Sequence, residues 1–199
     1  MNIGIDIDDT VSKTAEIMIG YANIFNIEVV KKEIKQNNLG AILDHKYLDA
    51  LYNWTKDEKK EFIEKYYKNI LKEVRVKEYA SEILRKLKQE ENQIYFITAR
   101  ITGIKNTDTI KLTEEWLKKN DIPYDEIIFD AQDKLAVCKE KKIDVFIDDS
   151  LENCKMVQQE NRISFLMDSI MNRNIDDNTI KRVHNWKEVY ENIKEICLV

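Results

Sequence analysis

The sequence predicts an α/β fold, a doubly wound parallel sheet with a small helical cap inserted after the first strand. Two observations lead to this prediction. After about residue 90, short apolar runs typical of buried strands alternate with segments of helical apolar spacing, as in parallel βαβ crossovers. Before that, residues 8–93 contain no convincing strand, although a crossover needs only about a dozen residues.

The strands are predicted from runs of apolar residues that are bounded by polar or charged ones. These runs are residues 3–7, 94–97, 127–129, 145–147 and 163–167. Helices are predicted where apolar residues recur every three or four positions. In the later part of the chain these segments are residues 78–88, 109–119, 134–142 and 151–160.

The helical insertion, residues 14–76, reads as several helices. One of them is predicted over residues 56–74, where Phe62, Tyr66 and Ile70 lie at helical spacing. Long insertions are commonly functional, and active-site lids belong at the carboxyl edge of such a sheet. We therefore expect a core of residues 1–13 and 77–199 and a cap of residues 14–76.

The first apolar run ends in three carboxylates, Asp6, Asp8 and Asp9, and the hydroxyl of Thr10. Side chains alternate along a strand, so Asp6 and Asp8 are expected on the same face. Two adjacent carboxylates repel each other, so that one takes up a proton or a cation lies between them. Oxygen ligands suit Mg²⁺, which commonly accompanies phosphate. The pattern predicts Mg²⁺-dependent phosphate chemistry.

Further polar residues follow the later strands and begin the later helices. Thr98-Ala99-Arg100 ends the second run, Asp133-Lys134 opens a helix, and Asp148-Asp149-Ser150 ends the fourth run. In a doubly wound sheet these positions meet at the carboxyl edge, where ligands bind. Together they offer carboxylates for a metal and cationic and hydroxyl groups for a phosphate.

These residues resemble the four motifs of the haloacid dehalogenase superfamily of phosphohydrolases. In chain order the motifs are Asp6-x-Asp8-x-Thr10, Thr98, Lys134 and Asp148-Asp149. The helical insertion resembles the smaller cap of that superfamily, and the rest resembles its Rossmann-like core. The resemblance implies a phosphomonoester hydrolase that uses Mg²⁺ and an aspartyl-phosphate intermediate.

Within the superfamily, the chain is most similar to the cytosolic and mitochondrial 5′(3′)-deoxyribonucleotidases and their bacterial relatives. The similarity lies in the first motif, in Phe96-Ile97-Thr98-Ala99-Arg100 and in Phe146-Ile147-Asp148-Asp149-Ser150. Ala99 departs from the pattern, since those enzymes often have Ser there. The implied substrate is a (deoxy)nucleoside monophosphate. A faint similarity to polynucleotide 3′-phosphatase domains leaves nucleic-acid ends open, and a sugar phosphate is a further alternative.

The resemblance implies a role for each motif residue. Asp6 would be the nucleophile, and Asp8 would protonate the leaving group and then activate water. Thr98 would hold a phosphoryl oxygen, with Arg100 as a second phosphate-binding candidate. Lys134 would pair with Asp6 and the phosphate.

The same resemblance implies a set of Mg²⁺ ligands. Asp149 would bind the ion together with a carboxylate oxygen of Asp6 and the backbone carbonyl of Asp8. Asp148 would lie behind these ligands or act through a water molecule. The order within the Asp148-Asp149 pair stays open.

Composition limits the remaining possibilities. The net charge of −5 argues against long nucleic acid as the main partner, and no apolar run is long enough to span a membrane. Acidic residues interrupt the first apolar run, so we expect no signal peptide. The Cys138, Cys154 and Cys197 spacing fits neither a disulfide framework nor zinc, which favours the cytoplasm. A homodimer is left open.

Several alternatives remain at this point. The chain could be a catalytically idle binding protein of the same fold, or a phosphotransferase whose cap excludes water. Asp9, Thr10 and Ser150 could simply cap helices, and Arg100 could form a structural ion pair. Lys134 could lie on a helix surface. The aromatic residues of the helical insertion could stack on a base or form a core; they are Tyr52, Trp54, Tyr66 and Tyr67.

Overall fold

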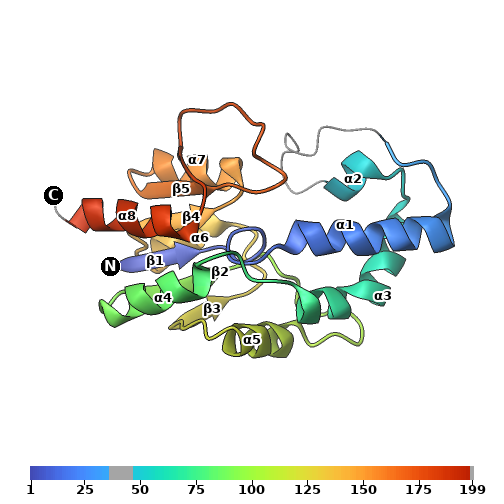
Figure 1. The fold of residues 1–199 in the computed structure, drawn as a ribbon, viewed down its shortest axis with the longest axis horizontal. Coiled ribbons are helices and arrows are strands. Elements are labelled where there is room, and N and C mark those ends of the chain that lie inside the picture. Colours follow the sequence, from blue (N-terminus) through green and yellow to red (C-terminus); the bar gives the residue numbers. More distant parts are fainter. Residues whose placement is uncertain (36–46, 198–199) are drawn as a thin grey trace.

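The computed structural model describes residues 1–35 and 47–197. Within these residues the chain forms a six-stranded parallel sheet of order β3-β2-β1-β4-β5-β6 (Figure 1). The strands are β1 (Asn2–Ile5), β2 (Gln93–Ile97), β3 (Glu126–Ile128), β4 (Val145–Asp148), β5 (Ile163–Met167) and β6 (Lys181–Val183). The strand order reverses between β1 and β4, as in doubly wound sheets. The predicted fold class is confirmed.

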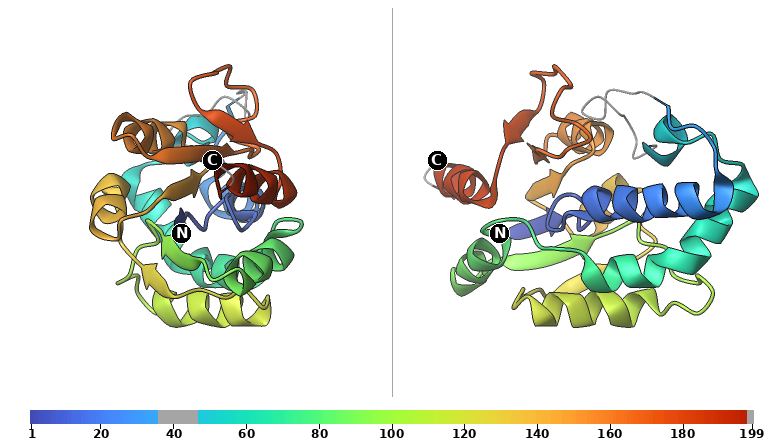
Figure 2. Two further views of the ribbon diagram at one scale, coloured as in Figure 1. Left: turned by 90° about the vertical axis from the view of Figure 1, so that its left-hand side faces the viewer. Right: turned by 45° about the vertical axis from the view of Figure 1, so that its right-hand side comes forward.

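The helices cover both faces of this sheet and one end of it (Figure 2). Helices α4 and α8 contact each other on one face, and α6 and α7 contact each other on the other. The helices are α1 (Thr14–Phe25), η1 (Asn26–Val30), α2 (Tyr47–Leu51), α3 (Lys56–Glu73), α4 (Ala80–Gln89), α5 (Thr109–Lys119), α6 (Lys134–Glu140), α7 (Leu151–Gln159) and α8 (Trp186–Cys197).

The apolar runs became strands because they are buried on both faces of the sheet. Ile3 and Ile5 of β1 pack in the cluster beneath α4 and α8, while Phe146 of β4 packs with α6 and α7 on the opposite face. The first strand is shorter than predicted, because the chain turns after Ile5 and the amides of Val11 and Ser12 donate to the carbonyl of Ile7. Strand β6 and helix α8 were not predicted.

Helices α1 and α3 and the segment around Trp54 form an apolar cluster distinct from the sheet clusters, joined by Met171 from the segment after β5. Helix α3 begins with a capping box, in which Thr55 and Glu58 satisfy each other's backbone amides. Two segments, residues 11–13 and 75–77, connect these helices to the sheet, and we call them the neck. They are joined by an antiparallel bridge between Ser12 and Val76 and by two backbone hydrogen bonds of 2.8 Å.

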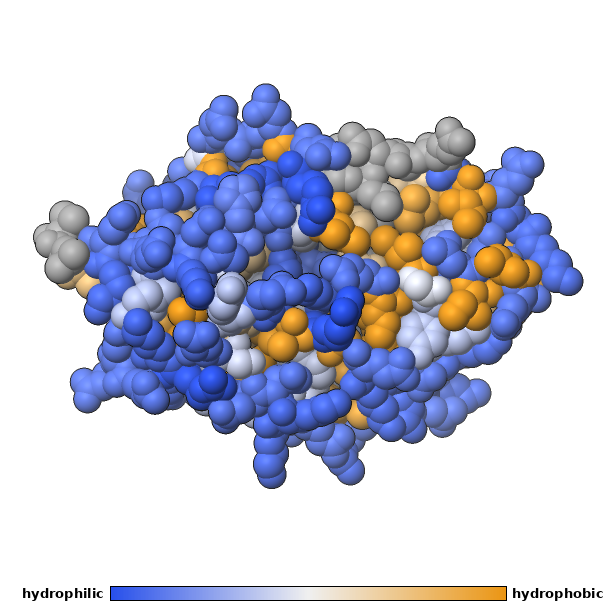
Figure 3. Space-filling model, viewed as in Figure 1, coloured by the Kyte–Doolittle hydropathy of each residue, from blue (hydrophilic) through white to orange (hydrophobic). Residues whose placement is uncertain are grey.

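Apolar side chains are visible on the surface over α1 and its surroundings, whereas the surface around the sheet is mostly hydrophilic (Figure 3). Ile24, Ile27, Val29 and Ile34 are exposed in this region. None of the described helices combines the length and the apolar character that crossing a membrane would require.

Candidate active site

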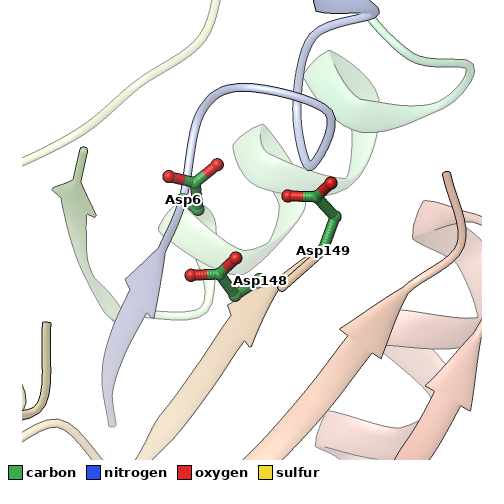
Figure 4. A group of neighbouring side chains, drawn as sticks. All are labelled: Asp6, Asp148 and Asp149. Carbon is green, nitrogen blue, oxygen red and sulfur yellow. The ribbon is translucent and has the colours of Figure 1, made fainter. Parts of the chain in front are cut away.

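Three carboxylates meet at the carboxyl ends of β1 and β4 (Figure 4). Asp6 directly follows β1, Asp148 is the last residue of β4, and Asp149 comes next. One oxygen atom from each lies within 4.8 Å of the others, and all three side chains are buried. The strand pairing of β1 with β4 therefore brings together two motifs that are far apart in the sequence.

Lys134 lies among these carboxylates. It is the first residue of α6, whose N-terminus is capped by the side chain of Asp133. Its Nζ atom is 2.5 Å from Oδ1 of Asp6 and 2.8 Å from Oδ2 of Asp148. Lys134 is buried, so it is not a residue of the helix surface.

The two neighbouring aspartates are held in different ways. Oδ1 of Asp148 accepts a hydrogen bond of 2.8 Å from the backbone amide of Ser150. Oδ2 of Asp148 accepts one from Lys134 and one of 2.9 Å from Nδ2 of Asn153. Asp149 is held through its backbone, whose carbonyl accepts a 2.7 Å hydrogen bond from Asn172. Both carboxylate oxygens of Asp148 are therefore already engaged by protein donors.

Asp8 forms an ion pair with Arg100, which is buried at the end of β2. Nε of Arg100 lies 3.2 and 3.0 Å from the two carboxylate oxygens, and Nη2 lies 2.7 Å from Oδ1. The hydroxyl of Thr14, at the start of α1, donates to Oδ1 at 2.6 Å. The alternative in which Arg100 forms an ion pair is thus confirmed, and it pairs with a predicted catalytic residue.

Burial dominates the electrostatics of this cluster. It raises the pKa of Asp6 to about 6, against the attraction of Lys134 and with the help of Asp148. Burial, with Asp148 and Asp6, also raises the pKa of Asp149 well above its usual range. Burial would raise the pKa of Asp8 as well, but the charge and hydrogen bonds of Arg100 outweigh it and lower that pKa. Asp6 and Asp149 thus resist full ionisation, and a bound cation would relieve the repulsion within the cluster.

A cavity of about 480 Å³ opens over these residues. Its polar lining includes Asp6, Asp8 and Lys134, and its apolar lining comes from α1, α3 and the segment after β2. The apolar residues are Met18, Ile63, Tyr67, Ile101 and Ile104. A larger depression of about 920 Å³ lies between α4 and α5, among charged side chains and away from the carboxylate cluster. The cavity over the carboxylates is the candidate active site because four of the predicted site residues line it, namely Asp6, Asp8, Arg100 and Lys134.

Thr98, Asp9 and Ser150 each form a hydrogen bond with the backbone near the site. Thr98 is fully buried, and its hydroxyl oxygen accepts a 3.2 Å hydrogen bond from the amide of Arg100. The carboxylate of Asp9 accepts hydrogen bonds from the amide of Ala15, in the first turn of α1. Ser150 caps α7. For Ser150 the helix-capping alternative is confirmed. Asp9 satisfies an amide of the first turn of α1, although the N-cap residue is Lys13. The buried Thr10 hydroxyl has no hydrogen-bond partner among the described residues, so it caps no helix.

The aromatic residues of the helical insertion divide into two groups. Tyr52, Trp54 and Tyr66 belong to the apolar cluster of the insertion, and the Trp54 and Tyr52 rings stack with centroids 4.5 Å apart. The indole nitrogen of Trp54 donates to Oδ1 of Asn26 at 2.8 Å. For these three residues the core alternative holds. Tyr67 differs, since it lines the cavity.

Replacing Trp54 with Ala is expected to lower the free energy of unfolding by about 3–5 kcal/mol, because it leaves a large cavity in a packed cluster. Urea unfolding followed by circular dichroism measures this change. The Trp54→Phe variant keeps most of the ring and should lose much less. A Trp54→Ala variant of normal stability that selectively lost nucleotide turnover would instead indicate contact with substrate.

Four residues that hold the site were not predicted, namely Thr14, Thr113, Asn153 and Asn172. Asn153 could have been found, because it lies in the first turn of the helix predicted right after Asp148-Asp149. Thr14 lies only six residues after Asp8, but a threonine at a helix start carries no distinctive signal. Thr113 and Asn172 come from more distant segments, and their types are common on any protein surface. Their proximity to the site depends on tertiary packing, which the local pattern does not encode.

Over residues 1–197 the chain matches the family described as 5′ nucleotidase, deoxy (Pyrimidine), cytosolic type C protein. A nucleotidase of Clostridium acetobutylicum is 30% identical over 192 residues, which cover 96% of this chain and 92% of that protein. Among solved structures, a haloacid dehalogenase-like hydrolase from Streptococcus pneumoniae has a TM-score of 0.69 at 13% identity, covering 96% of this chain and 97% of that one. A β-phosphoglucomutase from Clostridium difficile has a TM-score of 0.63 at 17% identity, with 98% and 95% covered.

The sheet topology and these similarities define a phosphatase of the haloacid dehalogenase superfamily. More narrowly, the chain belongs to the family of cytosolic type C 5′ deoxynucleotidases. The resemblance inferred from the four motifs is thereby confirmed. A small phosphate ester follows as the class of substrate.

Proposed function

We propose that this protein is a Mg²⁺-dependent phosphomonoester hydrolase that works through an aspartyl-phosphate and acts on (deoxy)nucleoside monophosphates. The observation that carries the proposal is the position of Asp6, a buried carboxylate at a strand end, 2.5 Å from the Lys134 ammonium group and facing a cavity. A carboxylate in this setting can attack phosphorus while the lysine compensates its charge.

The reaction has two steps, each an in-line displacement at phosphorus. In the first, an oxygen of Asp6 bonds to phosphorus as the bond to the leaving oxygen breaks, and the Asp8 carboxyl group gives its proton to that oxygen. Arg100 lowers the pKa of Asp8 in the free protein, and the negative charge of a bound phosphate raises it, so that Asp8 holds this proton when substrate is present. In the second, the Asp8 carboxylate takes a proton from water as the water attacks phosphorus, which releases Asp6 and phosphate. Lys134, Thr98 and Arg100 are the candidates for stabilising the phosphoryl oxygens and the charges of the carboxylates.

The residues around Asp6 fit Mg²⁺, because they offer only oxygen ligands and their raised pKa values favour an added cation. Asp6, Asp149 and the backbone carbonyl of Asp8 would hold the ion. Asp148 would support them from behind, since its oxygens already accept hydrogen bonds from Ser150, Asn153 and Lys134. When bound, Mg²⁺ would supply positive charge to the phosphoryl group and lower the cost of bringing two anions together.

We propose that residues 14–76 act as a cap over a core of residues 1–13 and 77–199. The separate apolar cluster of α1 and α3 and the two-segment neck support this division. Residues 36–46 of the insertion lie outside the described residues. The free cysteines Cys138, Cys154 and Cys197 are consistent with the reducing cytoplasm as the compartment.

The nucleotide preference is supported by the family and by the apolar lining of the cavity, where Tyr67 is a candidate for contact with the base. Tyr67→Ala is expected to lower kcat/KM for a nucleotide by roughly tenfold, because stacking on an aromatic ring contributes about 1–3 kcal/mol per base. Turnover of p-nitrophenyl phosphate should fall less, and Tyr67→Phe should retain most nucleotide turnover. Steady-state kinetics on both substrates measures this, and equal losses on both would exclude the role.

A substrate screen tests the proposed function. The purified protein is assayed with Mg²⁺ and with excess chelator against nucleoside and deoxynucleoside monophosphates, sugar phosphates and a 3′-phosphorylated oligonucleotide. We expect the highest kcat/KM on a (deoxy)nucleoside monophosphate. Preference for a sugar phosphate or for the oligonucleotide would overturn the nucleotide assignment and leave the phosphatase intact. If no ester is turned over, the protein is a binding protein of this fold.

A further inference from the structure

None of the proposed catalytic residues lies on helix α5. However, α5 contacts Arg100, the side chain that binds Asp8. We propose that Thr113 and Trp116 of α5 are positioning residues for Asp8 and that they act through Arg100. This inference rests on the proposed function, because it assigns Asp8 to proton transfer.

Arg100 contacts helix α5 directly. Nη1 of Arg100 donates to the hydroxyl oxygen of Thr113 at 3.1 Å, while Nε and Nη2 donate to Asp8. The guanidinium carbon lies 5.9 Å from the centre of the Trp116 ring. Thr113 and Trp116 are both buried. The guanidinium group is therefore fixed by Thr113 and Trp116 on one side and bound to Asp8 on the other.

The ion pair between Arg100 and Asp8 fixes the direction of the carboxylate. A guanidinium group is planar and rigid, so it orients the carboxylate that it binds at two positions. The arginine side chain is long and has several rotatable bonds. It can therefore hold Asp8 in one orientation only if other residues fix the guanidinium group. Thr113 provides the hydrogen bond that fixes the far end of the guanidinium group. Loss of that bond would let the group and Asp8 move together.

Trp116 also connects α5 to the neck. The indole nitrogen of Trp116 donates a 2.7 Å hydrogen bond to the carbonyl of Val74, which ends α3 directly before the neck. Helix α3 also packs on α5 through Tyr67, Leu71 and Leu112. Because α3 belongs to the helical insertion, α5 sets the position of Asp8 relative to the helices that border the cavity.

Misplacement of a proton-transfer group has a kinetic signature that general destabilisation does not have. An alkyl leaving group needs a proton as its bond to phosphorus breaks, whereas p-nitrophenolate leaves readily without one. Loss of orientation at Asp8 therefore slows turnover of an alkyl ester selectively. Arg100 is engaged by Asp8, and a substitution in α5 leaves the other candidates for phosphate contact, Lys134 and Thr98, in place. The change therefore appears mainly in kcat and not in KM.

The test compares Thr113→Val, which removes the hydroxyl at nearly constant shape, with Thr113→Ser, which keeps it. The substrates are deoxythymidine 5′-monophosphate and p-nitrophenyl phosphate. For Thr113→Val we expect kcat on the nucleotide to fall roughly 5- to 10-fold, with less than about a twofold change on the aryl ester and in both KM values. Thr113→Ser should restore kcat on the nucleotide.

Two further variants complete the experiment. Thr179→Val makes the same change outside α5, just before β6, where the hydroxyl of Thr179 donates to Asp177, and it should show no selectivity between the substrates. Trp116→Phe removes the hydrogen bond to Val74 and should reproduce the selective loss, which keeps the inference testable if Thr113→Val folds poorly.

Equal losses on both substrates in Thr113→Val and Trp116→Phe, or no rescue by Thr113→Ser, would overturn the inference. Failure of the proposed phosphatase reaction would look different, because the unaltered protein would then hydrolyse neither ester. Failure of the nucleotide assignment alone would leave turnover of p-nitrophenyl phosphate, and the preferred alkyl ester of the substrate screen then replaces the nucleotide in the same comparison.

Discussion

The Asp6→Asn variant is expected to lose at least about a thousandfold in kcat while keeping the fold. An amide cannot attack phosphorus as a carboxylate does, and it is a weaker ligand for Mg²⁺. The substitution preserves the shape of a buried side chain that lies 2.5 Å from Lys134. Steady-state turnover of p-nitrophenyl phosphate and of a nucleotide, with circular dichroism as a check on folding, measures the loss.

A matched control is Asp144→Asn. Asp144 directly precedes β4, at the opposite edge of the sheet from Asp148, and accepts a hydrogen bond from the amide of Asn2. This variant should keep activity within about twofold, as expected for a surface substitution away from the site. Mass spectrometry of rapidly quenched enzyme should detect phosphate on Asp6 in the unaltered protein. Turnover by Asp6→Asn at the rate of the unaltered protein would disprove the nucleophile assignment.

Removal of the metal is expected to lower turnover to the background rate, and added Mg²⁺ should restore it. Lys134 forms ion pairs with Asp6 and Asp148, and one ammonium group does not balance these carboxylates beside an incoming phosphate. Activity that survives exhaustive chelation would exclude the metal-dependent reaction. Calorimetric titration with Mn²⁺ provides a readout of binding that does not depend on turnover.

The two aspartates that follow β4 should respond differently. Asp149→Ala is expected to weaken metal binding by roughly 10- to 100-fold or more. Asp148→Ala should affect metal binding less and stability more, because it leaves Lys134, Asn153 and the amide of Ser150 without their acceptor. Thermal unfolding beside the Mn²⁺ titration separates the two effects. If Asp148→Ala weakened metal binding more than Asp149→Ala, Asp148 would be the direct ligand and Asp149 the supporting residue.

The strand ends could be predicted from the sequence because each combines two local signals. An apolar run such as 145–147 must be buried, and the polar residues directly after it must then lie at the sheet edge. Strand β6 was missed because Lys181-Arg182-Val183 contains too few apolar residues to stand out at the edge of a sheet. The position of Trp54 could not be predicted either, because local spacing does not tell whether an aromatic ring faces a core or a cavity.

The partners of the motif residues could not be predicted for a different reason. Thr113 and Asn172 reach Arg100 and Asp149 only through tertiary packing, and a single threonine or asparagine carries no distinctive pattern. The sequence therefore predicted the residues proposed for the chemistry better than the residues that orient them.

The neck also constrains the order in which the chain can fold. Strand β1 becomes central only when Ile3 pairs with both Ile94 and Val145, across a long stretch of intervening chain. Closing such a loop costs conformational entropy before any contact compensates for it. Once the helices of the insertion have packed and Ser12 meets Val76, the loop that still has to close is much shorter. Early packing of the insertion would thus speed assembly of the sheet. Substitutions in the apolar cluster of the insertion should therefore slow refolding as well as lower stability.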